Sequence, residues 1–241
     1  MPASPWISAA PTRRAFHCAA WGGWLLLASQ QAQALTLGDL SAAEAGSGLK
    51  GALEASALAA VGLLGQPDGF LGNPRVRIPL PGFWDEAAKV MRRLGQGPRL
   101  DALVTTLNRA AESAVPMGQD VLLAAVRSMT VEDAKGLLSG GGNAVTRFFA
   151  EKTRVPLGQK FLPVVTQATE QVALASQYNA LAGQAARFGL VQKDEARIEQ
   201  YVTGKTLDGL YFTMGEQEQK IRQNPAAAGS ALAQKVFGAL R

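Results

Sequence analysis

The sequence predicts an all-α protein, a single-domain multi-helix bundle with one extended, proline-rich strap. Apolar side chains recur at steps of three and four residues along most of the chain, as they do on one face of a helix. Only the strap alternates apolar and other side chains as a strand does, and no second such segment exists to pair with it. We therefore expect about eight or nine helices and no sheet.

The predicted helices cover most of the chain after residue 40. Glycine and proline residues separate them, because both interrupt helical hydrogen bonding. In chain order the helices run over about 41–64, from Trp84 to Met91, from Leu100 to Ala111, from Pro116 to Met129, from Thr130 to Gly140, over 144–154 and 160–186, from Leu207 to Ile221 and over 226–240.

Local signals place several helix ends. Ser41 and Glu44 match a capping box, and Thr130 with Asp133 matches a second capping signal. Pro163 predicts that its helix begins near residue 160, because the helix tolerates it only in the first turn.

Residues 65–82 predict the strap. Alternation favours an extended backbone, but two prolines exclude it from the interior of a sheet. We expect Val76, Ile78 and Leu80 to point inward against helices. A connection this long is uncommon unless it is functional or disordered, and its inward apolar residues argue against disorder. The candidate strap residues are Phe70, Arg75, Arg77, Ile78 and Leu80.

The first 34 residues have the order of a secretory signal peptide. A basic start and an apolar stretch precede Ala32–Ala34, which suits cleavage before Leu35. The apolar stretch is too short to span a membrane. We expect a cleaved leader over 1–34, one helical domain over 35–241 and a periplasmic location. A pair of arginines makes the twin-arginine route an alternative.

Such cleavage restricts the chemistry of the mature chain. The one histidine, His17, and the one cysteine, Cys18, leave with the leader. Their loss excludes Ser-His-Asp and Cys-His catalysis and metal sites with His or Cys ligands, so we expect no metal and no cofactor. Removing two arginines leaves 22 basic and 19 acidic residues, 22 − 19 = +3. That charge is too small and scattered to predict a nucleic-acid partner.

Three glycine motifs have simple structural interpretations. Gly46–Gly51 has GxGxxG spacing, but it lies inside a predicted helix, whereas a dinucleotide site needs a strand before it. Gly204–Thr206 resembles the end of a P-loop but lacks the required earlier glycine, and we interpret it as a turn between helices. Gly140–Asn143 is either an anion-binding loop or, as we favour, a flexible link.

Two groups of polar residues are candidates for a binding site or a buried cluster. Asn108 and Glu112 share one stripe of a helix, with Arg109 beside them. Glu218 lies in the middle of an apolar helix face, and Arg222 lies one turn further on. A buried carboxylate is costly unless it is paired, so we expect these two residues to form an ion pair.

Five segments, in order along most of 40–240, carry a resemblance. They are Gly69–Pro81 (GFLGNPRVRIPLP), Asn108–Glu112 (NRAAE), Met129–Lys135 (MTVEDAK), Leu207–Tyr211 (LDGLY) and Lys220–Pro225 (KIRQNP). In these segments the chain resembles a family of uncharacterised bacterial exported proteins, known as a domain of unknown function. The resemblance implies an exported helical domain and no particular reaction. The chain departs from the family pattern at Gln217, where a second adjacent Glu is expected.

Three functional hypotheses follow. The first is a non-catalytic binding or structural protein that holds a protein or an apolar ligand. Because the residues that carry the resemblance concentrate in the strap, the Asn108–Glu112 stripe and the 216–225 helix end, we expect these three segments to meet in space. The second is a hydrolase that uses carboxylates alone. Its candidates are Glu218, Glu112 and Asp208 as acid or base, with Arg109 or Arg222 steadying an anion. The third, ranked last, is peripheral membrane association through 226–240, whose polar face has few basic residues.

Overall fold

The computed structural model describes residues 42–140, 144–192, 194–224, 226, 231, 234 and 235, all of which fall within one compact unit. They form helices without any strand, so the all-α prediction is confirmed for this part of the chain. The leader, the link at 141–143 and most of the helix predicted over 226–240 lie outside the described residues. The elements are α1 (Ala42–Leu64), η2 (Gly82–Trp84), α2 (Asp85–Arg93), α3 (Gly97–Ala114), η3 (Val115–Gly118), α4 (Gln119–Arg127), α5 (Val131–Ser139), α6 (Ala144–Glu170), α7 (Ala173–Arg187) and α8 (Ile198–Gln223).

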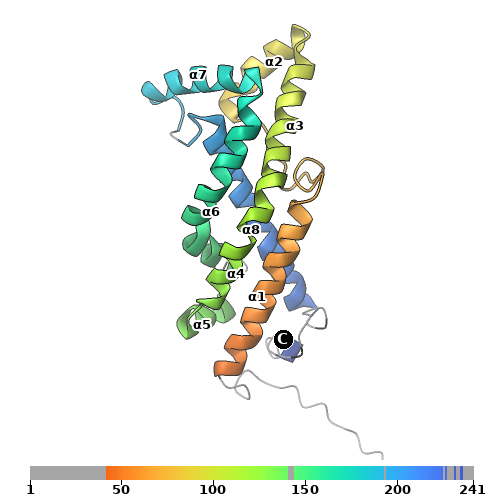
Figure 1. Ribbon diagram of the computed structural model, residues 1–241, viewed down its shortest axis with the longest axis vertical. Coiled ribbons are helices and arrows are strands. Elements are labelled where there is room, and N and C mark those ends of the chain that lie inside the picture. The colour runs from red at the N-terminus through yellow and green to blue at the C-terminus, as the bar shows by residue number, and fades with distance from the viewer. Residues whose placement is uncertain are drawn as a thin grey trace, which may run out of the picture. The chain divides into compact units, whose positions relative to one another are not determined.

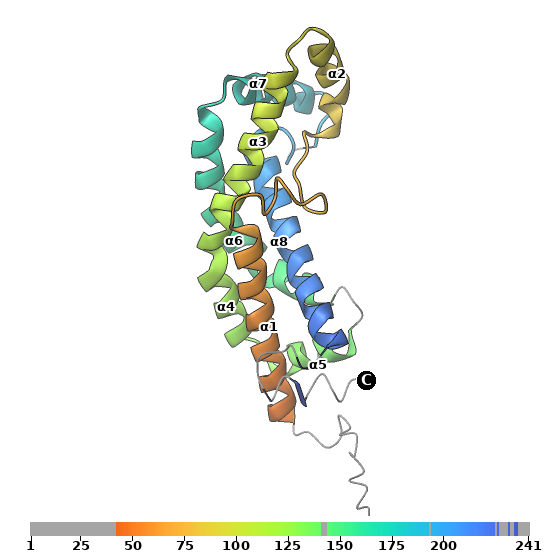
Figure 2. The ribbon, with the colours of Figure 1, turned by 90° about the vertical axis from the view of Figure 1, so that its right-hand side faces the viewer.

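Helices α6 and α8 form the central pair of the bundle, with α1 packed on α8 and α3 packed on α6 (Figures 1 and 2). Helices α4 and α5 continue one end, and α2 and α7 lie at the other. The core is built from the apolar stripes that the periodicity predicts, including Leu53 of α1, Leu107 of α3 and Leu210 of α8.

Helix α1 is apolar enough over Glu44–Leu64 to cross a membrane by length and composition. Half of that stretch is buried inside the bundle. Leu49, Leu53 and Leu64 belong to the core, which accounts for the composition of the helix.

Helix α6 differs from the prediction. We expected one helix over 144–154 and another over 160–186, but α6 continues through both of its prolines, ends at Glu170, and is followed by α7 from Ala173. Both prolines have exposed side chains, so the carbonyl groups that they leave without an N–H partner lie on the solvent side of the helix. Packing on the opposite face, which stays buried every four residues, keeps the helix intact. Its buried residues include Phe149, Thr153, Leu157, Phe161 and Val165.

Helix α8 begins earlier than the prediction. The segment Gly204–Thr206, interpreted as a turn, lies inside α8. Asn179 of α7 accounts for the early start, because its Oδ1 accepts a hydrogen bond from the backbone N–H of Ile198 at 2.8 Å. A side chain from another helix therefore satisfies a free amide at the start of α8, and local sequence cannot reveal such a cap.

The predicted capping box at α5 is confirmed. The hydroxyl group of Thr130 accepts a hydrogen bond from the backbone N–H of Asp133, and the Asp133 carboxylate accepts one from the N–H of Thr130. These two bonds fix the start of α5.

Candidate functional site

The strap leaves α1 at Gly65 and reaches η2 through a series of turns and then an extended stretch. Along that stretch Val76 and Ile78 are buried and Leu80 is half-buried, whereas Arg75 and Arg77 are exposed. The predicted inward residues are therefore confirmed. The strap has an apolar inner edge and a basic outer edge, although it is not part of a sheet.

Asn108 of α3 holds the middle of the strap. Its Oδ1 accepts a hydrogen bond from the Ile78 N–H at 2.8 Å, and its Nδ2 donates to the Ile78 carbonyl at 2.9 Å. Nδ2 also donates to the Val104 carbonyl of its own helix at 2.8 Å. Asn108 is fully buried. It replaces the partner strand that Ile78 lacks, because its amide pairs with both backbone groups of that residue.

Glu112, one turn after Asn108, holds the start of the strap. Its Oε1 accepts hydrogen bonds from the N–H groups of Phe70 and Leu71, each at 3.0 Å. Its Oε2 accepts a 2.7 Å bond from Arg109, which also bonds Asp68 at 2.8 Å. The side chain is almost completely buried, and its charge is satisfied by these three donors.

Helix α8 packs against the strap through a glycine. A Cβ atom on Gly209 would lie 2.9 Å from the Phe70 ring and 3.3 Å from the Val76 Cβ. The missing side chain lets the strap approach α8 closely. The strap is thus bonded to α3 and packed on α8.

The next turn of α8 adds charged contacts to the outer edge. Arg75 forms an ion pair with Glu216 and lies over the Phe212 ring, with 4.8 Å from its guanidinium carbon to the ring centroid. Asp208 forms a 2.7 Å ion pair with Arg154 of α6. The carboxylates of Glu216 and Asp208 are therefore each paired with an arginine.

Glu218 and Arg222 form a separate cluster. Glu218 is buried and forms an ion pair with Arg222, as the helical spacing suggests. Arg222 also donates to the Leu137 carbonyl of α5 at 3.0 Å.

The hydrogen bonds of Asn108 and Glu112 show that the strap and the Asn108–Glu112 stripe meet. The strap reaches the 216–225 region through the ion pair of Arg75 with Glu216. The pair of Glu218 and Arg222 instead joins α8 to α5.

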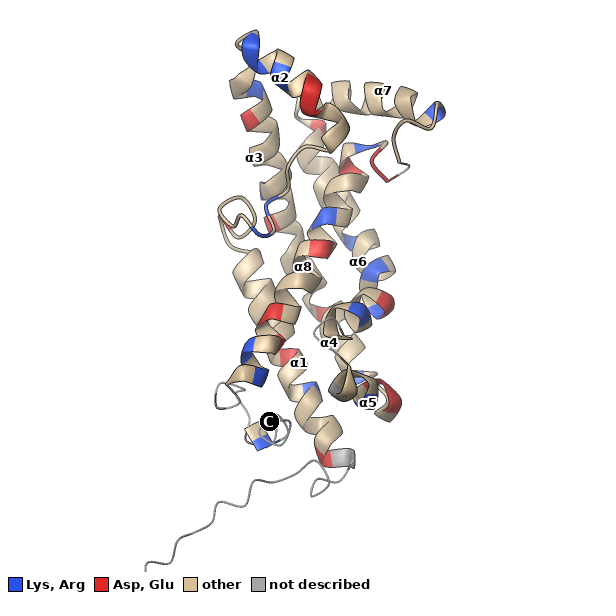
Figure 3. Cartoon of the chain, turned by 180° about the vertical axis from the view of Figure 1, so that it is seen from behind, with Lys and Arg blue, Asp and Glu red and all other residues tan. Residues whose placement is uncertain are grey.

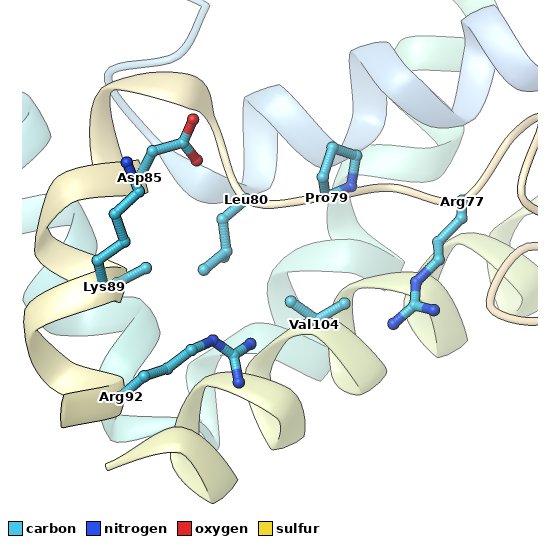
Figure 4. Close-up of a pocket in the computed structure, with 8 residues that line it drawn as sticks. Arg77, Pro79, Leu80, Asp85, Lys89, Arg92 and Val104 are labelled. Carbon is cyan, nitrogen blue, oxygen red and sulfur yellow. The ribbon is translucent and has the colours of Figure 1, made fainter. Parts of the chain in front are cut away.

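An open hollow of about 360 Å³ lies between the strap, α2 and α3 (Figure 4). Leu80 and Val104 face one another across it, and they give it an apolar floor together with Pro79 and Ala88. The guanidinium groups of Arg77 and Arg92 approach from opposite sides. Asp85 and Lys89 complete the lining.

The two arginines of this hollow differ in their partners. Arg92 forms a 2.7 Å ion pair with Asp101. The hydrogen bond from Arg92, with a smaller contribution from Arg77, holds the pKa of Asp101 below its ordinary value. Arg77 itself makes no ion pair with any residue that the structure describes, so it carries positive charge at the rim of an apolar floor.

A second hollow of about 310 Å³ lies on the other side of the strap, against α8. Arg77 lines this hollow as well as the first. The other two basic residues have aromatic neighbours: Arg75 lies over Phe212, and the Lys205 amine is 5.8 Å from the centroid of the Tyr201 ring. Burial raises the pKa of the Tyr201 hydroxyl to about 12, so the group stays neutral at physiological pH.

Sequence reasoning missed several polar residues. Lys89 and Arg92 were not singled out because exposed cations on a helix carry no distinguishing signal. Glu199, at the start of α8, is buried and accepts hydrogen bonds from Asn179 at 2.8 Å and Arg197 at 3.3 Å. Its apolar neighbours in the sequence, Ile198, Tyr201 and Val202, could have indicated burial, but its partners lie across a turn that was not predicted.

No group of three or more His, Cys, Asp or Glu side chains suited to holding a metal ion is found among the residues that the structure describes. The acidic candidates Glu112, Asp208 and Glu218 instead each bind an arginine. The arrangement is one of structural ion pairs around a positively charged strap.

Comparison with protein families gives a match over most of the chain. Neither the curated proteins nor the solved structures include a significant match. The family described as "Protein of unknown function (DUF4197)" matches residues 39–238, which include the strap and both polar clusters. The chain therefore belongs to the DUF4197 family.

Proposed function

We propose that this protein is exported and works as a non-catalytic binding protein, with the outer face of the strap as its binding surface. The observation that carries the proposal is the hollow at Arg77. Asn108 and Glu112 hold the backbone of the strap on either side of Arg77, whose exposed side chain lines the hollow beside its apolar floor.

The chemistry of this hollow favours a ligand with an anionic group and a small apolar body. Arg77 makes no ion pair with a described carboxylate, so binding an anion there breaks no existing pair. Leu80 and Val104 offer apolar contact beneath it. A volume of about 360 Å³ suits a small molecule or the end of a protein chain.

A binding role accounts for the carboxylates better than the hydrolase hypothesis does. A glycosidase-type mechanism needs one carboxylate available as an acid and another as a base or nucleophile. Glu112 accepts three hydrogen bonds, and Glu218 and Asp208 each bind an arginine. These contacts suit structural roles.

The native fluorescence of the mature chain provides a direct test. Trp84 is the only tryptophan after residue 34, and it precedes Asp85 of the hollow. We expect hexanoate to change Trp84 fluorescence in a saturable way, with much weaker effects from hexanol and hexylamine. Arg77→Gln should weaken hexanoate binding about tenfold, because a charge-assisted hydrogen bond is lost.

Lys160→Gln is the matched control, because it removes the same charge from an exposed position on α6. It should leave hexanoate binding unchanged. Equal weakening by both variants, or equal binding of hexylamine and hexanoate, would contradict the proposal.

Export has its own test. The protein recovered from the periplasmic fraction should begin at Leu35, as determined by N-terminal sequencing. An intact N-terminus on protein found only in the cytoplasm would overturn this part of the proposal.

A further inference from the structure

Two turns at one end of the bundle expose large apolar side chains. Phe188 and Leu190, after α7, are 81% and 76% exposed, and Leu94, after α2, is 72% exposed. Gly189 lies between the first two with φ +71°, a left-handed conformation that ends the helix. Such exposure is costly in water unless another surface covers these residues.

The apolar surface continues along α2. Phe83, Val90 and Leu94 are spaced by seven and four residues, so they share one face, and all three are exposed. Trp84 of η2 and Met91 of α2 lie on the packed side. The segment from η2 to the end of α2 therefore has an outer apolar stripe in addition to the face that it packs on the bundle.

The elements that carry the two apolar turns meet where η2 packs on α7, and the turns themselves lie at the far ends of α2 and α7, on opposite sides of this end of the bundle (Figure 3). The rings of Phe83 and Trp84 each lie 5.4 Å, centroid to centroid, from the ring of Tyr178 in α7. Figures 1 and 2 both show α2 and α7 at the same end of the bundle. Leu181 of α7 is also exposed.

Basic side chains accompany these turns. Residues 87–100 contain four cations and no carboxylate, and Arg187 precedes Phe188. Figure 3 shows the blue of Lys and Arg concentrated at the tip of α2. Acidic residues lie at the start of α2, where Glu86 pairs with Lys89, and in the segment that follows α7. The four cations on either side of Leu94 are Lys89, Arg92, Arg93 and Arg99, of which Lys89 pairs with Glu86 and Arg92 pairs with Asp101.

We propose that this end of the bundle docks on an anionic lipid surface. Leu94, Phe188 and Leu190 insert among the lipids, while the arginines beside them contact lipid phosphate groups. Protruding apolar residues flanked by cations are the combination that binds peripheral proteins to such surfaces. A lipid surface can also receive both turns, the one with Leu94 and the one with Phe188 and Leu190, because it needs no shape complementary to theirs. The proposal does not use Arg77. Lys89 and Arg92 also line the proposed hollow, whereas Leu94, Arg93, Arg99, Phe188 and Leu190 do not.

Vesicle flotation with the mature chain tests this proposal. We expect binding to vesicles of phosphatidylcholine that contain about a third phosphatidylglycerol, weaker binding to phosphatidylcholine alone, and loss of binding at high salt. The triple variant Leu94→Ser, Phe188→Ser, Leu190→Ser should lower the affinity at least about a hundredfold. Arg93→Gln with Arg99→Gln should lower it about tenfold or more.

Val155→Ser is the control, because Val155 of α6 is 71% exposed but lies on another element. It should bind vesicles as the unmodified chain does. All these side chains are exposed, so unchanged thermal unfolding would show that the variants remain folded. Absence of binding, equal binding to neutral vesicles, or equal loss with Val155→Ser would overturn the proposal. A dimer in solution that the triple variant abolishes would assign the surface to a second copy instead.

Discussion

Glu112 and Glu218 are buried to almost the same extent, with 4% and 3% of their surface exposed, yet their partners differ. Glu112 holds two backbone N–H groups of a segment about forty residues away. Glu218 pairs with an arginine of its own helix. Burial alone therefore does not reveal what a carboxylate does, and its partners must be known. The comparison predicts that the two residues differ in their effect on stability and on the strap.

The largest effect should come from Glu112→Ala. It removes the acceptor for two strap amides and the main partner of Arg109, so we expect the free energy of unfolding to fall by about 4 kcal/mol. Urea unfolding measures the loss. Glu112→Gln keeps an acceptor for the amides and should lose about half as much. A loss below about 1 kcal/mol for the alanine variant would contradict the role given to Glu112.

Asn108→Ala should follow, with a loss of about 3 kcal/mol, because the N–H and carbonyl groups of Ile78 lose their buried partner. Asn108→Asp separates the two halves of the contact: the Ile78 N–H keeps an acceptor, but the carbonyl loses its donor. Because an unpaired carboxylate is costly at this fully buried position, unfolding in urea should show the aspartate variant to be no more stable than the alanine variant. Equal stability of all three proteins would show that the strap is not held here.

Glu218→Ala should cost less, about 2 kcal/mol. Its partner Arg222 is 28% exposed, so water can solvate the guanidinium after the carboxylate is removed. The strap should keep its native amide chemical shifts in this variant, whereas Glu112→Ala should change them. A larger loss than that of Glu112→Ala would reverse the comparison.

The smallest loss of stability should come from a change in the capping box of α5, the helix whose Leu137 carbonyl accepts a hydrogen bond from Arg222. The backbone hydrogen bond from Thr130 is the main reason that the pKa of Asp133 lies below its ordinary value. This contribution to stability is present above the pKa of Asp in the unfolded chain and is lost as pH falls through the lower folded pKa. Asp133→Asn should remove this pH dependence and cost about 1 kcal/mol at neutral pH, measured by unfolding across acidic pH.

The sequence predicted features that depend on nearby residues. Helical periodicity identified the core faces, and alternation identified the inward side chains Val76 and Ile78. The capping box at Thr130 and the spacing of Glu218 and Arg222 involve neighbours within four residues, so one local segment contains both partners.

Features that depend on distant residues were predicted less well: the meeting of the strap with the Asn108–Glu112 stripe was expected, but not which groups bond. The amides that Glu112 binds lie beyond a whole helix in the chain, and no local pattern links them. Pro163 was expected to begin a helix, but packing of α6 against α8 and α3 outweighs its local effect. The hollow at Arg77 likewise depends on how α2 folds back on α3, which the residues of α2 do not reveal.

Amide hydrogen exchange tests most directly whether the strap is a fixed part of the fold. The N–H groups of Phe70 and Ile78 are bonded to buried side chains of α3. They should exchange about as slowly as the core amides of α8, and Glu112→Ala should accelerate the exchange of Phe70. Exchange at the rate of an unprotected loop in the unmodified protein would contradict the account, because the strap would then not hold Arg77 in a fixed place.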